Sequence, residues 1–225
     1  MFKIETHLHT KTSSGCGHLS ASEILDGYQA AGYSGICVTD HYLRYYFVQM
    51  GILDLPKHKQ LDRFLLGYQE LCEAAPEYGI RIFRAAELRF DESENDYLFY
   101  GWPDEILADP EPVFSMGLKA FHELSRKSNA VLIQAHPFRA PSLPADISCL
   151  DGVEIFNGHP RHNSHNELAQ SLLRAHPELI GTSGSDCHRS MDIARGGIVV
   201  DHMPKDEREL ADILRNRSFI CIEPE

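Results

Sequence analysis

Seven short apolar segments of the sequence each border a residue type that binds metals. The segments are 2–6, 36–39, 80–86, 97–100, 131–135, 153–156 and 179–185. Asn95 and Asp96 precede the fourth segment, and polar or metal-binding residues follow the other six. Short apolar runs of this kind are typical of buried strands. The pattern therefore predicts strands whose ends supply ligands to one polynuclear metal centre.

Two of these borders carry paired ligands. His7 and His9 are two residues apart, and so are Asp186 and His188. In a strand, residues i and i+2 point to the same face of the sheet. Each pair can therefore present two ligands to a single point.

Helical patterns alternate with the predicted strands. The clearest helix begins with Ser20 and Glu23 at a capping-box spacing and ends at Gly32. Apolar residues at helical intervals predict further helices over 57–78, 115–128, 163–176 and 205–216, whereas 103–112 reads as a surface loop.

Alternating strands and helices predict an α/β fold with parallel strands. Because ligands border nearly every strand, a closed barrel is favoured over an open sheet, which gathers its ligands at one switch point. We expect one domain over residues 1–225.

Composition narrows the range of partners. The formal net charge is -12, from 33 acidic and 21 basic residues. An extended nucleic-acid surface needs basic side chains, so none is expected. No apolar run approaches the roughly 20 residues of a membrane span, and residues 1–7 do not resemble a signal peptide. Six cysteines without a CxxC pair favour reduced thiols and a cytoplasmic location. The sequence indicates no particular oligomeric state.

The residue types at the strand ends suit metal-assisted hydrolysis. Mixed imidazole and carboxylate ligands bind Mn, Fe or Zn. Two such ions about 3.5–4 Å apart hold a bridging hydroxide and stabilise a phosphoryl transition state. Arg139 and Arg195 follow ligand motifs and are candidates for contacts with a phosphate. His159 is a candidate proton donor to the leaving group.

Five motifs, in this order, resemble the PHP (polymerase and histidinol phosphatase) family. They are His7-Leu8-His9-Thr10, Thr39-Asp40-His41, Glu87, Ala135-His136-Pro137 and Gly184-Ser185-Asp186-Cys187-His188. The resemblance spans about residues 1–200. It implies a distorted (β/α)7 TIM-like barrel of parallel strands, with two or three divalent metal ions at the C-terminal strand ends.

Position by position, the resemblance implies three metal sites. One metal would take His7, His9, Glu87 and Asp186; a second would share Glu87 and take His136; a third would take His41 and His188. Where many relatives have Asp or His in the next loop, this chain has Cys16 and His18, so either residue or water completes the third site. Asp96 stands where a His is common, and an oxygen ligand there would favour a harder metal such as manganese.

The expected function is a metal-dependent phosphoesterase that hydrolyses a small phosphomonoester, with Glu87 and Asp186 as catalytic ligands. One alternative is an amidohydrolase-like C–N hydrolase, but the strand ending at Glu87 has no lysine that could bridge two metals. The other alternative is a non-catalytic, metal-binding regulatory domain. The full set of ligand positions argues against that alternative, whereas Cys16 and Asp96 leave it open.

Overall fold

The computed structural model describes residues 1–223 and contains all seven predicted strands. Three further strands, β3, β9 and β10, are present. The bounds are β1 (Phe2–Glu5), β2 (Tyr33–Val38), β3 (His41–Tyr42), β4 (Arg81–Arg89), β5 (Asp96–Tyr100), β6 (Val131–Gln134), β7 (Gly152–Asn157), β8 (Ile180–Gly184), β9 (Gly197–Val200) and β10 (Ile220–Ile222).

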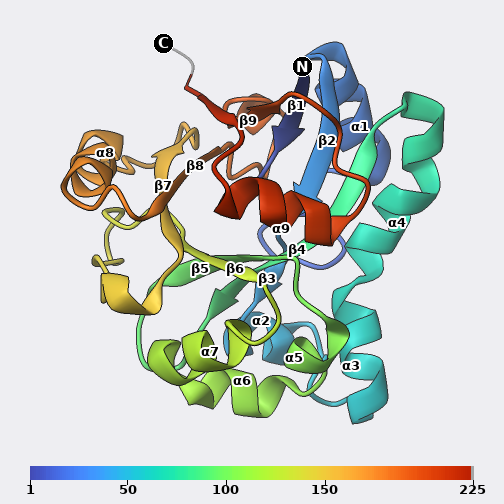
Figure 1. Ribbon diagram of the computed structural model, residues 1–225. Helices are drawn as coiled ribbons and strands as arrows, with labels where there is room; N and C mark the ends of the chain where they lie inside the picture. Colours follow the sequence, from blue (N-terminus) through green and yellow to red (C-terminus); the bar gives the residue numbers. More distant parts are fainter. Residues whose placement is uncertain (224–225) are drawn as a thin grey trace.

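The strands form one curved sheet that nearly closes on itself (Figure 1). The strand order is β10-β9-β1-β2-β4-β5-β6-β7-β8, and β3 pairs with β4 beside this path. Between β8 and the opposite edge, the Ser183 hydroxyl donates to the Ile222 carbonyl at 2.5 Å and accepts from the Gly197 amide at 3.3 Å. The predicted α/β fold, a distorted TIM-like barrel, is confirmed.

The expectation that all strands are parallel is wrong for two parts of the sheet. β5 runs antiparallel to β4 and β6, and β9 runs antiparallel to β1 and β10. The reversal of β5 has a consequence for the ligands. β5 begins at Asp96, which pairs with Arg89 at the end of β4. A ligand that precedes β5 therefore lies at the same end of the barrel as ligands that follow parallel strands.

Helices cover the outside of the barrel, with α1 and α4 on one side, α8 on the opposite side and α5 to α7 below the sheet in Figure 1. Their bounds are α1 (Ala21–Ala30), α2 (Arg44–Gln49), α3 (Lys57–Phe64), α4 (Leu66–Ala74), α5 (Asp104–Leu107), α6 (Pro110–Met116), α7 (Leu118–Ser125), α8 (Asn166–Ala175) and α9 (Glu207–Arg215). No helix within residues 1–223 has the length and apolar character that crossing a membrane requires.

The five predicted helices are confirmed, with one break. The predicted helix over 57–78 divides into α3, α4 and a 3-10 turn at Ala75–Tyr78. The α1 capping box is present, because Ser20 and Glu23 each accept a hydrogen bond from the other's backbone amide. The predicted loop over 103–112 is wrong in part, since α5 and α6 form there. Pro103 caps α5 and Pro110 opens α6, and proline is tolerated in the first turn of a helix.

Helix α9 closes the end of the barrel opposite the ligands. Side chains of α9 join the apolar cluster that fills the barrel interior, which includes Ile4, Phe83, Leu98, Ile133, Ile198, Leu210 and Leu214. Asn129, just before β6, donates to Asp212 of α9 at 2.8 Å. One end of the interior is therefore apolar and covered, and polar residues are confined to the other end.

A buried carboxylate joins three elements beneath the polar end. Glu5, at the end of β1, is fully buried. Its Oε1 accepts from the amides of Thr6, His7 and Ser185, each at 2.9 Å. Its Oε2 accepts from the Tyr28 hydroxyl at 2.7 Å and from the Ser185 hydroxyl. The contacts connect β1, α1 and the segment after β8.

We predict that Glu5→Ala lowers the free energy of unfolding by about 3 kcal/mol, because several buried donors lose their acceptor. Glu5→Gln should cost less, about 2 kcal/mol, since its oxygen still accepts from the amides and its NH2 group can donate to the Tyr28 hydroxyl. The Ser185 hydroxyl already accepts from the amides of Arg195 and Gly196 and would lose its own acceptor. Urea unfolding followed by circular dichroism measures both. The exposed control Glu77→Ala should change stability by less than about 0.5 kcal/mol. A Glu5→Ala protein as stable as this control would contradict the prediction.

Candidate metal centre

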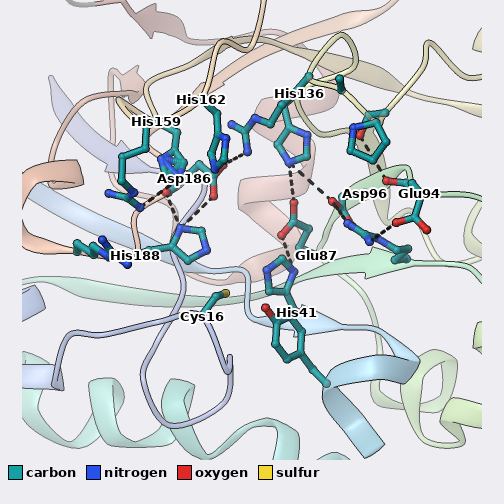
Figure 2. Close-up of a pocket in the computed structure, with 18 of the residues that line it drawn as sticks. Cys16, His41, Glu87, Glu94, Asp96, His136, His159, His162, Asp186 and His188 are labelled. Carbon is teal, nitrogen blue, oxygen red and sulfur yellow. Dashed lines mark hydrogen bonds and ion pairs between the residues drawn. The ribbon is translucent and has the colours of Figure 1, made fainter. Parts of the chain in front are cut away.

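The residues predicted as ligands come from distant parts of the chain and meet at the open end of the barrel. His7 and His9 follow β1, His41 begins β3, Glu87 lies in β4, His136 follows β6, and Asp186 and His188 follow β8. Figure 2 shows Glu87 between His41 and His136, with Asp186 beside His188.

Glu87 contacts four imidazoles. Its carboxylate oxygens lie 3.3 Å from Nε2 of both His7 and His9, 2.8 Å from His41 Nδ1 and 3.2 Å from His136 Nε2. Ligand atoms that are each about 2.1 Å from one ion lie about 3–3.5 Å from one another. The spacing around Glu87 is therefore that of a ligand shell.

Asp186 lies near two of these four imidazoles, those of His7 and His9. Its Oδ1 lies 3.6 Å from His7 Nε2 and 3.5 Å from His9 Nε2. It also lies 3.4 Å from His188 Nδ1. Glu87 and Asp186 thus approach the same imidazole nitrogens. Among residues 1–223, however, only three of the four side chains expected to hold the first metal, His7, His9 and Glu87, form a group whose donor atoms all lie within 4.8 Å of one another, so the place of Asp186 in the first site stays a prediction.

Several buried ring nitrogens in this cluster lack a well-formed hydrogen bond. Within residues 1–223, Nε2 of His7, Nε2 of His9 and Nδ1 of His41 form no hydrogen bond of normal geometry, although carboxylate oxygens of Glu87 lie 2.8–3.3 Å away. The other nitrogen of His7 is held by Glu154 at 2.9 Å, and that of His9 lies 3.3 Å from the Ser14 hydroxyl. A buried polar atom without a partner costs free energy, and a cation would accept these lone pairs. The donor set therefore fits divalent metal ions.

Electrostatics prepare some of the candidate ligands for metal binding, whereas His7 and His41 must first lose a proton. Burial would lower the pKa of both rings, but the charge of Asp186 beside His7 and of Glu87 beside His41 raises it well above that of a free imidazole. Burial alone would raise the pKa of Glu87, but the charge of His41 holds it well below its usual range. Burial would also raise the pKa of Asp186, but the charge of His7 keeps it well below its usual value. Burial lowers the pKa of His9 well below that of a free imidazole. The carboxylates are thus ionised and His9 is neutral.

Two ligand candidates have unusual backbone conformations. His136 has a φ of 28° and Asp186 a φ of 51°. Residues other than glycine rarely adopt positive φ, and each such conformation costs about 1–3 kcal/mol. Strain of this kind persists where the surrounding structure holds a side chain in a required position. Here the backbone conformation directs both side chains into the ligand cluster.

Asp96 lies next to Glu87, as the sequence predicts for a replacement ligand. Donor atoms of His41, Glu87 and Asp96 all lie within 4.8 Å of one another, and Asp96 Oδ2 is 3.9 Å from His136 Nε2. Arg89 donates to both oxygens of Asp96 at 2.7 Å. Asp96 can therefore reach a second ion only in competition with Arg89, and its ligand role stays a prediction.

The two candidates in the loop after β1 differ in position. Cys16 belongs to a group whose donor atoms lie within 4.8 Å of one another and which also contains His9, His41 and His188. Burial would raise the pKa of Cys16, but the charge of His41 and a hydrogen bond from His188 lower it to about 6. His18 lines the cavity, yet it is in none of the possible metal-binding groups found among residues 1–223.

A cavity of about 410 Å³ opens above the ligand cluster. Its lining includes four arginines, Arg89, Arg139, Arg161 and Arg189, together with His159 and His162. Of the two arginines predicted to contact a phosphate, Arg139 is in this lining and also donates to Asp186 at 2.7 Å. Arg195 is not among the described residues that line the cavity, and its Nε donates to the Gly158 carbonyl at 2.8 Å.

His159 lines the cavity, but its protonation state does not suit the predicted proton donor. Burial and the charges of Arg139 and Arg161 lower its pKa to about 4, against an opposing effect of Asp186. Arg161 also donates to His159 Nε2 at 3.1 Å, which places the ring proton on Nδ1. At neutral pH the imidazole is therefore uncharged.

Two buried acids that support the site are not predicted from the sequence. Glu154 of β7 holds Nδ1 of His7 and accepts from the His136 amide at 3.0 Å. Asp40 accepts from the Thr10 amide and the Ser14 hydroxyl, each at 2.7 Å, and so orders the loop after β1. A charged residue inside the apolar run 153–156 is the signal that indicates a polar role for Glu154.

We predict that chelator-treated protein binds about two or three divalent ions per chain and becomes more stable. Each ion at about 100 times its Kd stabilises the native state by about 2.7 kcal/mol, so even one bound ion raises the Tm of a chain this size by about 5–10 °C. Elemental analysis and thermal denaturation with manganese, zinc or iron measure both effects.

Glu87→Gln should bind fewer ions than the wild type, because Glu87 contacts four of the predicted ligands. Glu94→Gln is the matched control, since Glu94 lines the same cavity outside the possible metal-binding groups found among residues 1–223. Equal metal content in the wild type and Glu87→Gln would show that Glu87 is not a ligand.

Comparison with solved structures shows the same fold in other proteins. A two-domain protein from Bacteroides vulgatus, containing a predicted PHP-like metal-dependent phosphoesterase, matches with a TM-score of 0.69 at 18% identity. The match covers 99% of this chain and 64% of that protein, so this chain spans less than two thirds of its length. PsfC from Pseudomonas syringae matches with a TM-score of 0.65 at 16% identity, over 99% of this chain and 91% of PsfC.

The lesion-specific endonuclease PfuEndoQ from Pyrococcus furiosus matches with a TM-score of 0.61 at 11% identity, over 96% of this chain and 56% of the endonuclease. No curated protein matches the sequence significantly. The family model described as PHP domain matches residues 5–215. Because this match includes every ligand motif and nearly the whole sequence, the chain belongs to the PHP domain family.

Proposed function

We propose that the protein is a metal-dependent phosphoesterase that hydrolyses a small phosphomonoester. The observation that supports this most is the set of buried imidazole nitrogens, without well-formed hydrogen bonds among residues 1–223, that converge with Glu87 and Asp186 on the floor of an arginine-lined cavity. The imidazoles and carboxylates at the floor of the cavity suit cations, and the arginines along its walls suit an anion. A phosphate ester supplies an anion with a bond that metal ions help to break.

The ligands would be divided among two or three ions of manganese, iron or zinc. His7, His9, Glu87 and Asp186 would hold the first ion, Glu87 and His136 the second, and His41 and His188 the third. When bound, the ions would supply Lewis acidity and an activated water. Glu154 would keep His7 in the tautomer whose Nε2 is free to bind, because it accepts from Nδ1.

The arginines on the walls would bind the phosphoryl oxygens. Arg139 donates to Asp186 and Asn157, so it also positions one ligand carboxylate. Arg189 is exposed at the cavity wall, where its guanidinium is available to an incoming anion. Charge-assisted hydrogen bonds to a phosphate are strong, and they strengthen as charge builds up on the transferring group.

His159 would bind the substrate as a neutral hydrogen-bond donor. Its Nδ1 is buried and lacks a hydrogen-bond partner within the described range 1–223, while Nε2 accepts from Arg161. The N–H group at Nδ1 can form a hydrogen bond to a substrate oxygen without giving up its proton. Its place in the cavity supports a catalytic contact, as predicted from the sequence, but in a different role.

A second cavity of about 760 Å³ offers space for the leaving group. It shares His41, Tyr46, Arg89 and Glu94 with the first, and its lining adds Leu43, Tyr45, Val48 and Phe90. Both volumes are within the range of small-molecule sites. Tyr45 and Val48 are 68% and 61% exposed, so α2 presents apolar surface beside the cluster. This arrangement supports a substrate of modest size.

Charge argues against a long nucleic acid as the substrate. The endonuclease with the same fold acts on DNA lesions, and one solved structure shows it with a 27-mer duplex. This chain has a net charge of -12, whereas sequence-independent binding to DNA needs clustered lysines and arginines. The few arginines at the cavity suit a single phosphate better than a duplex.

We predict turnover of p-nitrophenyl phosphate, or of one member of a panel of nucleotide and sugar phosphates, after loading with manganese, iron or zinc. Glu87→Ala should lower turnover by more than about 100-fold, since even partners outside the ligand shell are worth 10–100-fold. Glu77→Ala, at an exposed residue that lines neither cavity, is the control and should leave turnover unchanged. Full metal loading without phosphatase activity would reject the proposal. Hydrolysis of a cyclic amide instead would favour a C–N hydrolase. Metal binding that stabilises the protein without any hydrolysis would favour a regulatory domain.

We also predict that Arg189→Ala lowers kcat/KM for the best phosphomonoester by about 10–100-fold, which corresponds to the loss of one charge-assisted hydrogen bond. Arg174 is exposed on α8 and does not line the cavity, so Arg174→Ala should keep kcat/KM within about twofold of the wild type. Steady-state kinetics at saturating metal measure both variants. Equal kinetics for the two variants would exclude Arg189 from substrate binding.

A further inference from the structure

We propose that Cys16 is a thiolate ligand, and that the site it forms with His41 and His188 selects zinc over manganese. The inference deepens the proposed function and depends on the metal centre described there. Figure 2 shows Cys16 between His41 and His188, at the edge of the cavity. Their donor atoms lie within 4.8 Å of one another, and the same group includes His9.

Buried nitrogens without a well-formed hydrogen bond point to an ion at this place. Among residues 1–223, His41 Nδ1 and His9 Nε2 form no hydrogen bond of normal geometry, although Glu87 Oε2 lies 2.8 Å and 3.3 Å from them. Since His9 also belongs to the group with His7 and Glu87, its nitrogen is available to only one of the two ions. Three protein ligands and one open position are the usual coordination of a catalytic zinc ion. Cys16, His41 and His188 provide those three ligands.

The loop that carries Cys16 is held in position on both sides. The amide of His18 donates to the carbonyl of His188 at 2.9 Å, so the loop is tied to the segment that supplies another ligand. A Cβ atom at Gly17 would lie 2.4 Å from the Thr10 carbonyl oxygen, so only glycine permits this close approach. Cys16 is therefore placed beside the two imidazoles by the backbone.

Cys16 differs from the other cysteines of the chain. Cys37, Cys149 and Cys187 are buried within apolar clusters. All six cysteines lie in the described part of the chain, and of these only Cys16 lines the cavity. Cys16 is therefore the cysteine that is positioned to share an ion with the imidazoles of His41 and His188.

A thiolate would make this site different from its neighbours. The adjoining groups offer only imidazole and carboxylate, which accept manganese, iron or zinc alike. Thiolate ligands favour zinc and disfavour manganese, which prefers oxygen. The centre would then hold two kinds of ion, with zinc at Cys16 and a harder metal beside Glu87 and Asp96.

Cobalt(II) tests the thiolate directly, because thiolate ligation gives a charge-transfer band in the near ultraviolet. Chelator-treated full-length protein loaded with cobalt should show this band, and Cys16→Ser should lose it while still binding cobalt at the other sites. Cys72→Ser is the matched control and should keep the band, since Cys72 lies on α4 outside the cavity. Circular dichroism of each metal-free variant checks that it is folded.

Metal competition provides a second readout. Cys16→Asp replaces sulfur with oxygen and should shift the bound zinc-to-manganese ratio toward manganese by about 10-fold or more, measured by elemental analysis after equilibration with both ions. Cys72→Ser should leave the ratio unchanged. An unchanged ratio in Cys16→Asp would overturn the proposed selectivity.

Spectra and activity separate this inference from the proposed function. A wild-type protein that shows the band but hydrolyses no phosphate ester would retain Cys16 as a ligand and reject the phosphoesterase. A wild type that binds no cobalt, a cobalt-loaded wild type without the band, or a band of equal intensity in Cys16→Ser would each overturn the thiolate ligand, whatever the activity.

Discussion

The pairing of two buried carboxylates with the surrounding imidazoles is the interaction on which the rest of the polar end of the barrel depends. Glu87 contacts four imidazoles, and Asp186 approaches two of the same rings. In a poorly solvated interior, ionised groups persist only when they are paired, hydrogen-bonded or bound to metal. The barrel must therefore bring β1, β4 and the segment after β8 together closely, and the chain accepts backbone strain at His136 and Asp186 to do so.

A second layer of buried acids keeps this pairing in register. Glu154 orients His7, Asp40 orders the loop that follows His9, and Glu5 ties β1 to the segment that carries Asp186. None of these three acids is among the described residues that line the cavity. Each accepts hydrogen bonds from backbone amides or side chains of the ligand-bearing segments. The site is thus held from behind by groups that need not touch a substrate.

The fold and the convergence of the candidate ligands were largely predictable, because both follow from local patterns. Strand-like apolar runs that end in metal-binding residues indicated the barrel and the residues that converge. The antiparallel course of β5 was missed, although Asp96 precedes its strand instead of following it. Glu154 was missed for a different reason: its role depends on which face of β7 points into the barrel, and a single charged residue in a short run is a weak signal.

The sequence by itself determined the strand positions, the capped first helix and the residue types available for metal binding, since these depend on spacing and chemical identity along the chain. Only the tertiary structure decided which candidate ligands lie within reach of one another, that Arg139 lines the cavity while Arg195 does not, and that His159 is neutral. The physical reason is that distance, burial and electrostatic field at a site are set by segments far apart in the chain, and no local pattern records them.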